Sequence, residues 1–365
     1  MVVLIPAYQP NEELIKLTHL FIEKTDFSLV VVNDGSSPEK DEIFSQLPEQ
    51  VTLLKHAQNC GKGRAMKTGM AYIQDHYPAN EALVVVDADG QHILPDVLKV
   101  CDALADHPDS LVLGSRLFTG KVPFRSKFGN TITRYVFAAA SGQMVHDTQT
   151  GLRAFPVSLI PQLLEFNGDR YEYEMNMLLG AAKQGIPMHE VYIETVYLDE
   201  ENSSSHFHPL RDSMRIYGCI FKFIAPSLLK FGSSSLAAFV IDASLLLLLE
   251  WLFGMTALTA SVQLLLCVVI ARICSSIFNF FVNQRFVFKK QDDPWRSLLK
   301  YYALVVVILG LNYGLMYILK LLIGLHTIVA KLLVEVILFL FSYTMQQLFV
   351  FKSRKNRSKN LTTHS

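Results

Sequence analysis

The chain has 365 residues, is 51% hydrophobic, and balances 33 Lys and Arg against 33 Asp and Glu. The even charge argues against a nucleic-acid partner, and five cysteines without metal-ligand spacing exclude a zinc site and favour a reducing compartment. The apolar excess lies after about residue 225, so we expect a soluble first half and a membrane-embedded second half. Val2–Ile5 leads directly into Pro6 without a basic region, so we expect no signal peptide.

Short apolar runs alternate with helical segments in the first half. The runs predict buried strands at 2–5, 29–32, 51–54, 82–86 and 111–113. Asn11 can cap a helix after the first run, and a second helix follows Gly61-Lys62-Gly63. Strands that alternate with helices predict an α/β domain with a mostly parallel sheet and helices on both faces.

Polar residues stand where these predicted strands end. They are Tyr8, Asp34, Asp87, Asp89 and Arg116. In an open α/β sheet, ligands bind outside the carboxyl ends of the strands, so we expect these side chains along one rim. Together with a Gly-Lys-Gly loop before a helix, they indicate a pocket for a nucleotide diphosphate. The sequence has neither a Walker A motif nor a G-x-G-x-x-G after the first strand, which argues against P-loop and dinucleotide folds.

The stretch Asp87-Ala88-Asp89-Gly90-Gln91-His92 is the most informative of these strand ends. Asp87 and Asp89 can both reach one cation, and Gln91 adds a further oxygen. Oxygen ligands suit Mg²⁺ or Mn²⁺, and Mg²⁺ typically joins one or two carboxylates to substrate phosphates. The stretch therefore predicts a divalent-metal site, and a solvated Asp-Asp-Gly turn is the alternative for this pattern taken alone.

Six motifs follow one another in order along the first half. They are IPAY at 5–8, VNDGSS at 32–37, NCGKGRA at 59–65, DADGQH at 87–92, GSR at 114–116 and DTQTGLRAF at 147–155. This series resembles glycosyltransferase family 2, in the branch of the dolichyl- and polyprenyl-phosphate sugar synthases. The resemblance implies a GT-A fold, a nucleotide-sugar donor and inversion at the sugar carbon. It departs at the first loop, where Gln9-Pro10 precedes Asn11-Glu12.

The resemblance also implies a role for each motif residue. The nucleotide sugar would be held by Pro6, Ala7, Tyr8, Asp34, Gly61, Lys62, Asp87 and Ala88. The metal, Mg²⁺ or Mn²⁺, would be held by Asp87, Asp89 and Gln91. The residues expected to act in catalysis are Asp89, Arg116, Arg134 and Asp147, with Arg116 near the acceptor phosphate.

The acceptor decides whether the reaction needs a base. A lipid phosphate is already anionic near neutral pH, because phosphate monoesters have a second pKa of about 6. It needs only positioning, by Arg116 together with Arg125 or Arg134 as candidates. A sugar hydroxyl needs a carboxylate base, for which Asp147, Glu172 and Glu174 are candidates. The arginines and the membrane half favour the lipid phosphate.

Four apolar stretches in the second half are long enough to span a bilayer. They cover about 231–253, 257–282, 301–324 and 327–350. The link at 289–300 and the tail are basic, whereas the links at 254–257 and 324–327 carry no Lys or Arg. The positive-inside rule therefore predicts a cell-membrane protein whose first domain and C-terminus are cytoplasmic.

The second half also repeats internally. Asn279–Phe288 recurs as Ser342–Phe351, and Leu228–Phe231 recurs as Leu298–Tyr301. Each unit holds two spans, so orientation is kept and the repeat is parallel, about the membrane normal.

The alignment of the repeats places intramembrane Arg272 against Glu335, and we expect these two side chains to pair between the repeats. The four spans and the two Phe-Val-Phe endings resemble the GtrA-like family, small proteins linked to moving lipid-linked sugars across membranes. This second resemblance covers about 225–352.

The sequence thus predicts a GT-A domain followed by an all-α membrane domain of four helices. The expected divisions are 1–215 for the transferase, 216–230 for an amphipathic juxtamembrane segment, 231–352 for the GtrA-like spans and 353–365 for a basic tail. The expected activity is sugar transfer from a nucleotide-diphosphate sugar to an undecaprenyl-type polyprenyl phosphate for cell-surface glycan synthesis. Direct transfer to a wall-polymer hydroxyl and a sugar-sensing translocase or scaffold are alternatives, and homo-oligomerisation is left open.

Overall fold

The computed structural model describes residues 1–365 except 117–123, 195–208, 254–258, 290–293 and 352–365. The expected basic tail at 353–365 lies outside the described residues. The chain divides into two compact units, Met1–Phe223 and Ile224–Ser365, and each is described by itself.

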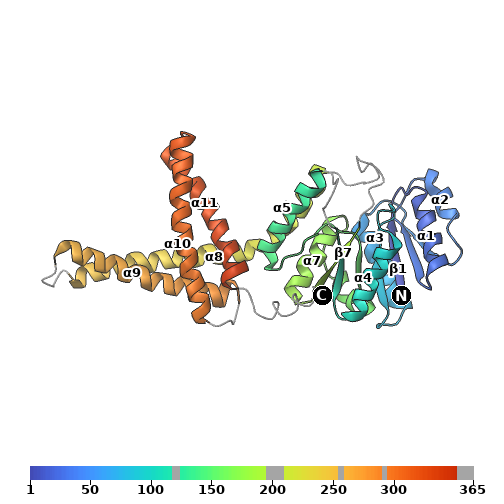
Figure 1. The fold of residues 1–365 in the computed structure, drawn as a ribbon, viewed down its shortest axis with the longest axis horizontal. Helices are drawn as coiled ribbons and strands as arrows, with labels where there is room; N and C mark the ends of the chain where they lie inside the picture. The colour runs from blue at the N-terminus through green and yellow to red at the C-terminus, as the bar shows by residue number, and fades with distance from the viewer. Residues whose placement is uncertain (117–123, 195–208, 254–258, 290–293, 352–365) are drawn as a thin grey trace. The chain divides into compact units, whose positions relative to one another are not determined.

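The first unit is built on a seven-stranded, mostly parallel sheet, as the sequence predicts (Figure 1). The strands are β1 (Val2–Ala7), β2 (Ser28–Asn33), β3 (Thr52–Lys55), β4 (Ala82–Val85), β5 (Leu111–Arg116), β6 (Arg153–Pro156) and β7 (Met188–Ile193). Their order is β3-β2-β1-β4-β6-β5-β7. β1 is buried along its whole length, because it pairs in parallel with β2 on one side and β4 on the other.

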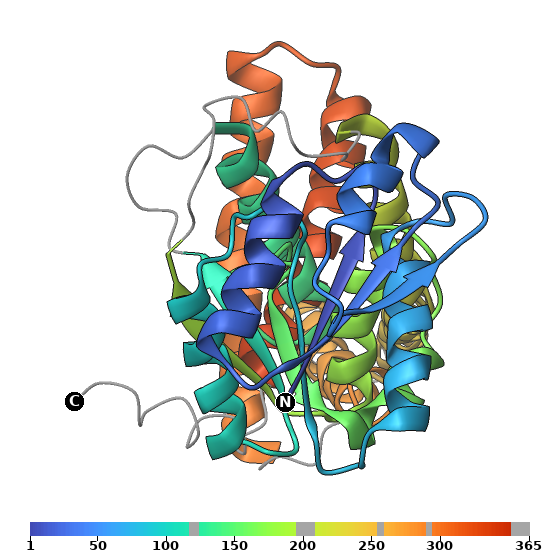
Figure 2. The same cartoon turned by 90° about the vertical axis from the view of Figure 1, so that its right-hand side faces the viewer.

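Helices cover both faces of this sheet. α1 (Glu13–Lys24) and α4 (Leu94–Asp106) bury Leu14, Phe21, Val97 and Val100 against Val3 of β1 and its neighbours on one face. On the other face, α3 (Lys62–His76) packs its Gly69 directly on Leu4. Figure 2 shows α1 and α3 on opposite sides of the blue strands. The alternation of side chains along β1 thus supplies two cores from a single apolar run.

Five of the seven strands match the apolar runs, and the other two were not predicted. β6 is antiparallel and lies between β4 and β5, so Arg153 is level with Val85 and with Leu113. Because β6 runs in the opposite direction, its first residue lies at the edge where the parallel strands end. The polar stretch 147–152 is therefore delivered to the same rim as the predicted strand-end residues.

The remaining helices of the first unit follow the sheet in chain order. They are α2 (Asp41–Ser45), α5 (Phe124–Ser141), α6 (Ile160–Leu164) and α7 (Glu172–Gln184), with short 3₁₀ turns at Pro38–Lys40 and Val157–Leu159. The expected interfacial segment 216–230 is part of helix α8 (Pro209–Phe253), which continues from one unit into the other.

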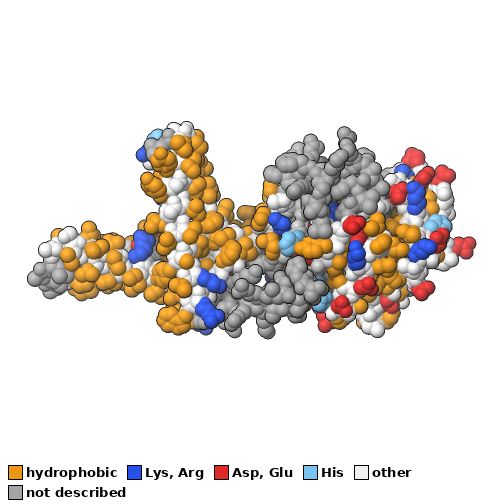
Figure 3. Space-filling model, viewed as in Figure 1, with side chains coloured by type: hydrophobic (Ala, Val, Ile, Leu, Met, Phe, Trp, Pro, Cys, Tyr) orange, Lys and Arg blue, Asp and Glu red, His pale blue; other side chains and the backbone are white. Residues whose placement is uncertain are grey.

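Among the described residues, four helices are long and apolar enough to cross a membrane, and the first of them, α8, enters the second unit at Ile224. After α8 come α9 (Ala260–Val282), α10 (Pro294–Tyr317) and α11 (Thr327–Met345), and three π-helical turns follow at Asn283–Val287, Ile318–Leu322 and Gln346–Val350. Figure 3 shows their surface as mostly hydrophobic side chains with a few charged ones between them. A surface with so many exposed large apolar side chains suits lipid.

Contacts between these helices follow the equivalences that the repeat predicts. The ring pair Phe231–Tyr343 has centroids 5.6 Å apart, and the equivalent pair Tyr301–Phe280 has centroids 5.5 Å apart. Side chains that the repeat makes equivalent to each other also meet directly. Phe288 stacks on Phe351 at 5.1 Å, and Asn283 donates to Gln346 at 3.2 Å. The π-turns Asn283–Val287 and Gln346–Val350 stand at equivalent places, which fits an approximate two-fold arrangement.

The expected pairing of Arg272 with Glu335 is wrong. Arg272 lies 3.3 Å from Asp242 of the neighbouring helix α8, whereas Glu335 lies 2.6 Å from Lys331 one turn earlier on α11. Arg272 and Glu335 are therefore each paired with an oppositely charged residue of their own repeat.

Candidate active site

The side chains that could carry chemistry gather at the carboxyl ends of β1, β2, β4 and β5. This is the rim that the sequence predicts, and the loop before β6 joins it. Pro6 and Ala7 end β1 inside the core, while Tyr8 is 37% exposed. Gln9 follows with a positive φ of 49°, and its backbone N–H donates to Ser36 Oγ at 2.9 Å. The first loop is thereby tied to the loop after β2.

Asp34 is buried and organises the loop before α3. Its Oδ1 accepts from the backbone N–H of Cys60 at 2.9 Å and lies 2.7 Å from His56 Nδ1. Its Oδ2 accepts from Asn59 Nδ2 at 3.0 Å and from the Gly61 N–H at 2.8 Å. A carboxylate that accepts from this many donors fixes the turn before α3, and Gly61 lies within that turn.

Gly61 also has a φ of 102°, and a Cβ there would clash with the backbone of Asp169, so glycine is required. Among the described residues, Asp34, His56 and Cys60 offer metal-ligating atoms within 4.8 Å of one another. Because both oxygens of Asp34 already accept hydrogen bonds, we assign no ion to this group.

Lys62 begins α3 and joins two carboxylates at the rim. Its Nζ lies 2.6 Å from Asp87 Oδ1 and 3.1 Å from Glu174 Oε1. Burial opposes the charge on Lys62, but Asp87 and Glu174 outweigh it and raise the pKa of the ammonium. Burial likewise opposes the charge on Asp87, yet Lys62 keeps the pKa of that carboxyl below its usual value. A permanently charged lysine therefore lies where a diphosphate is expected.

The stretch after β4 supplies the predicted metal ligands. Ala88 packs against the core, and the Gln91 backbone N–H donates to Asp89 Oδ1 at 3.1 Å, which folds the stretch back on itself. Burial, and then the charge of Asp87, raise the pKa of Asp89 to about 6. Crowded carboxylates with a further amide oxygen are the donor set that Mg²⁺ or Mn²⁺ prefers, and a dication relieves their repulsion. The residues present therefore fit a divalent ion.

Gly151 sets how closely the β6 loop approaches these carboxylates. A Cβ at this position would overlap the carboxylate of Asp87. Arg153, fully buried, holds the loop in place: its guanidinium donates to the Thr150 carbonyl and to the Glu174 carbonyl. The backbone of the DTQTGLR stretch is thus in direct contact with the candidate metal site.

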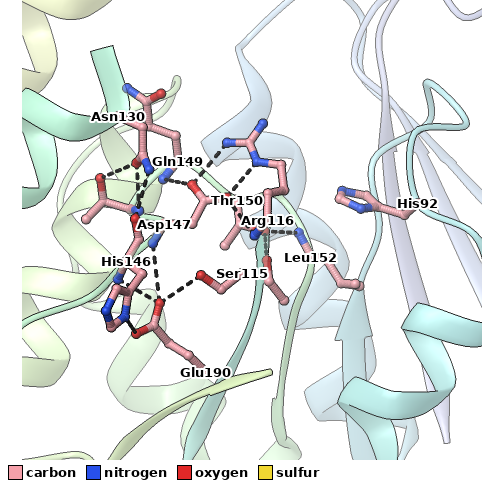
Figure 4. A network of polar contacts seen from close by, with 12 residues as sticks. His92, Ser115, Arg116, Asn130, His146, Asp147, Gln149, Thr150, Leu152 and Glu190 are labelled. Carbon is pink, nitrogen blue, oxygen red and sulfur yellow. Dashed lines mark hydrogen bonds and ion pairs between the residues drawn. The ribbon is translucent and has the colours of Figure 1, made fainter. Parts of the chain in front are cut away.

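Arg116, at the end of β5, is held by Asp147. Its Nε donates to Asp147 Oδ2 at 2.6 Å and its Nη2 donates to Oδ1 at 3.0 Å (Figure 4). Asp147 is fully buried and also accepts from the Gln149 backbone N–H. Because both of its oxygens are bound, Asp147 is poorly suited to take a proton, and the geometry favours a positioning role for it.

Glu190 of β7 holds the loop that carries Asp147. It accepts from Ser115 Oγ at 3.0 Å and from the His146 backbone N–H at 2.7 Å, and its other oxygen lies 2.8 Å from His146 Nδ1 (Figure 4). Asn130 of α5 accepts from the Thr148 N–H on the opposite side of the loop. Arg134 lies one turn further along α5, where its guanidinium covers the ring of Tyr135.

Several residues of the site were not found by sequence reasoning. They are Gln9, His56, Gly151, Arg153 and Glu190. Gly151 and Arg153 stand inside the motif DTQTGLRAF, but the motif alone did not show what either residue contacts. His56 and Glu190 lie outside every motif, and no local pattern marks them, because their partners are 22 and 44 residues away in the sequence.

The first unit is thus a GT-A-like domain whose polar side chains gather at one rim of the sheet, and the second is a helical domain with apolar, membrane-spanning helices. Models of two families match these parts: Glycosyl transferase family 2 over residues 2–161, and the GtrA/DPMS transmembrane domain over 229–351. A UDP-N-acetylglucosamine–dolichyl-phosphate N-acetylglucosaminyltransferase of Methanococcus voltae is 30% identical over 217 residues, which is 54% of this chain and 85% of that protein. The chain belongs to glycosyltransferase family 2 and carries a GtrA/DPMS transmembrane domain.

Two further proteins are similar to this chain. The polyprenol monophosphomannose synthase of Mycolicibacterium smegmatis is 26% identical over 207 residues, covering 52% of this chain and 75% of that protein. Among solved structures, glucosyl-3-phosphoglycerate synthase from Mycobacterium tuberculosis with Mn²⁺, uridine diphosphate and phosphoglyceric acid has a TM-score of 0.46 and 15% identity. That match covers 60% of this chain and 77% of the other.

Proposed function

We propose that the protein transfers a sugar, with inversion, from a nucleotide-diphosphate sugar to a polyprenyl phosphate of the undecaprenyl type at the cytoplasmic face of the membrane, for cell-surface glycan synthesis. Relatives named as dolichyl- and polyprenyl-phosphate sugar transferases support the acceptor class. The observation that carries the proposal is the pair of ion pairs at the rim. Lys62 contacts Asp87, and Asp147 fixes the orientation of Arg116.

The engaged carboxylates favour a phosphate acceptor over a hydroxyl. Asp147 is bound by Arg116, Glu174 lies beside Lys62 and Arg153, and Glu172 accepts from backbone N–H groups at the start of α7. Arg116 engages both oxygens of Asp147, but Glu172 accepts only through Oε1, and its Oε2 has no hydrogen-bond partner among the described residues, so Glu172 is the remaining candidate base for a sugar hydroxyl. An anionic phosphate attacks without a base, and the cations beside Asp147 and Glu174 suit it.

The rim residues divide the work between donor and acceptor. A divalent ion bound by Asp87, Asp89 and Gln91 would take up charge on the departing nucleotide diphosphate. Lys62 adds a fixed positive charge beside the same phosphates. Arg116, held in one orientation by Asp147, would orient the acceptor phosphate for attack on the sugar carbon, with Arg134 nearby on α5.

The test uses membranes that contain the full chain and a panel of labelled nucleotide sugars. Label in the organic phase is the expected result, and purified protein with polyprenyl phosphate should then reproduce the transfer. Asp89→Asn should reduce transfer to background, because it removes a charged metal ligand, while Asp75→Asn on the exposed side of α3 should not.

Unchanged turnover in Asp89→Asn would show that the reaction does not depend on a metal ion at Asp89. Transfer to a soluble acceptor without lipid would favour the hydroxyl reaction, and donor binding without any transfer would favour a scaffold.

A further inference from the structure

Lys62 contacts two carboxylates of the candidate site unequally. Its Nζ lies 2.6 Å from Asp87 Oδ1, a short distance for a charge-assisted hydrogen bond, but 3.1 Å from Glu174 Oε1. That oxygen of Glu174 is buried and forms no hydrogen bond with any described residue. A buried acceptor without a hydrogen bond costs free energy, so Glu174 offers the ammonium of Lys62 a second place to bind.

The two carboxylates are held in place, whereas the lysine can move between them. The backbone of Gly151 lies so close to the Asp87 carboxylate that a Cβ on Gly151 would overlap it. Glu174 stands in the first turn of α7, and its Oε1 also lies 3.6 Å from the guanidinium of the fully buried Arg153. The side chain of Lys62 is a flexible four-carbon chain that ends in three donors. A change in this cluster therefore moves Lys62 and leaves the acids where they are.

Lys62 competes with a divalent ion for Asp87. The donor set that fits such an ion consists of Asp87, Asp89 and Gln91, and Lys62 already binds one oxygen of Asp87. An ammonium and a dication on the same carboxylate repel each other strongly, because like charges a few ångströms apart are little screened where both side chains are partly buried. Lys62 on Asp87 thus lowers the affinity for the ion, and an ion on Asp87 drives Lys62 toward Glu174.

Lys62 is drawn away from Asp87 in the same sense by a nucleoside diphosphate. It follows Gly61 at the start of α3, where the phosphate oxygens would be further acceptors for its ammonium. An ammonium shared between these oxygens and Glu174 no longer neutralises Asp87, and the free carboxylate attracts a dication more strongly. The ion and the diphosphate each release Lys62 from Asp87, so the binding of either one favours the other.

We propose that Lys62 exchanges between Asp87 and Glu174, and that Glu174 is a positioning residue that holds the lysine beside the diphosphate once a divalent ion binds Asp87. The exchange couples the two ligands beyond their direct contact with each other, because both displace one side chain. Such a coupling is reciprocal, since each ligand strengthens the binding of the other by the same factor. The inference rests on the proposed function only for the binding of these two ligands at the rim, and it requires neither the sugar nor the acceptor.

The test measures Mn²⁺ binding to the purified full-length protein in detergent, by the electron paramagnetic resonance signal of the free ion. Titrations are made without nucleotide and with saturating UDP or GDP. Lys62→Gln should raise the affinity for Mn²⁺ alone about tenfold, a typical coupling between two sites, because Asp87 loses its competing cation. The nucleotide should then strengthen Mn²⁺ binding by a smaller factor than in the unsubstituted protein. Lys24→Gln, which removes a charge from the exposed end of α1, is the control and should change neither value.

Glu174→Gln should act in the opposite direction. Lys62 then binds Asp87 alone, so we expect the affinity for Mn²⁺ without nucleotide to fall. This effect should disappear when Lys62→Gln is added, because Glu174 acts through the lysine and the two substitutions are then not additive. An equal effect of Glu174→Gln with and without Lys62 would overturn the proposal and would show that the glutamate acts on the ion through its charge.

The remaining outcomes separate this inference from the proposed function. Unchanged Mn²⁺ affinity in Lys62→Gln would overturn the exchange alone. Weaker Mn²⁺ binding in both single variants would also overturn it, because Lys62 would then support the ion site rather than compete for it. No Mn²⁺ binding in any variant, with or without nucleotide, would overturn the exchange together with the metal site of the proposed function.

Discussion

Residue by residue, the site depends on acids that hold cations rather than on acids that take protons. The Arg116–Asp147 pair is the clearest case, because its two parallel hydrogen bonds fix the plane of the guanidinium. Asp147 is in turn fixed by backbone N–H groups and by the loop that Glu190 holds. A cation with one allowed orientation can present an acceptor phosphate without reorganisation during the reaction.

Asp147→Asn should therefore impair transfer without impairing donor binding. An amide can accept from only one of the two guanidinium donors, so Arg116 would lose its fixed orientation. We expect the transfer rate to fall about 100-fold, the order that a misplaced group costs, while the dissociation constant for nucleotide sugar stays the same. Steady-state kinetics and calorimetric titration measure the two effects. Asp102→Asn, on the exposed side of α4, is the control, and weaker donor binding in Asp147→Asn would contradict the positioning role.

Gly151→Ala, unlike Asp147→Asn, should weaken the binding of the donor and its metal ion. The added Cβ would overlap the carboxylate of Asp87, so either the β6 loop or the metal site must move. We expect weaker binding of the divalent ion and the nucleotide, measured by titration of Mn²⁺ in the presence of a nucleoside diphosphate. Gly129→Ala is a matched control, because a Cβ there meets nothing within 4 Å. If Gly151→Ala and Gly129→Ala bound Mn²⁺ and the nucleoside diphosphate with equal affinity, the close approach of the β6 loop to Asp87 would not matter for binding.

At the scale of elements, periodicity and apolar content predicted five strands and all four membrane helices. β6 was not predicted, because it is short, antiparallel and begins with an arginine whose charge is buried. Such a charge is tolerated because the carbonyls of Thr150 and Glu174 accept its hydrogen bonds and because the Glu174 carboxylate lies 3.6 Å from the guanidinium. This compensation is tertiary, so no local pattern could have shown it. The same limit applies to Arg272, whose partner depends on helix packing.

The packing of α4 makes a prediction about thiol chemistry. Burial against the sheet raises the pKa of Cys101 to about 12, so its thiol stays protonated in the native protein. Iodoacetamide should label the partly exposed Cys60 in the native protein, while Cys101 stays unlabelled until the protein unfolds. Peptide mass spectrometry reads both sites.

The same shift predicts a pH effect on stability. The unfolded thiol loses its proton near pH 9 and the native thiol only near 12. The native state therefore binds the extra proton in this window, and the contribution of Cys101 to stability falls as the pH rises through it. Rapid labelling of native Cys101 at about pH 9 would show that α4 opens readily.

At the scale of the whole molecule, the family assignment combines a donor-binding unit with a membrane unit in one chain. Helix α8 contains residues of both units. The number of spans follows from apolar lengths alone. Their orientation rests on the uneven distribution of Lys and Arg, which is a property of sequence that the contacts within the spans do not test.

Orientation can be measured with two single cysteine substitutions in the full chain. The basic link and the first unit are expected to be cytoplasmic, since Lys289 and Lys290 follow the second span and Arg296 and Lys300 lie in the first turns of α10. His326→Cys, before α11, should then react with a membrane-impermeant maleimide in intact cells. Trp295→Cys, at the start of α10, should react only in inverted vesicles or after permeabilisation. The reverse pattern would place the donor site on the side without nucleotide sugars, where the proposed transfer could not draw on them.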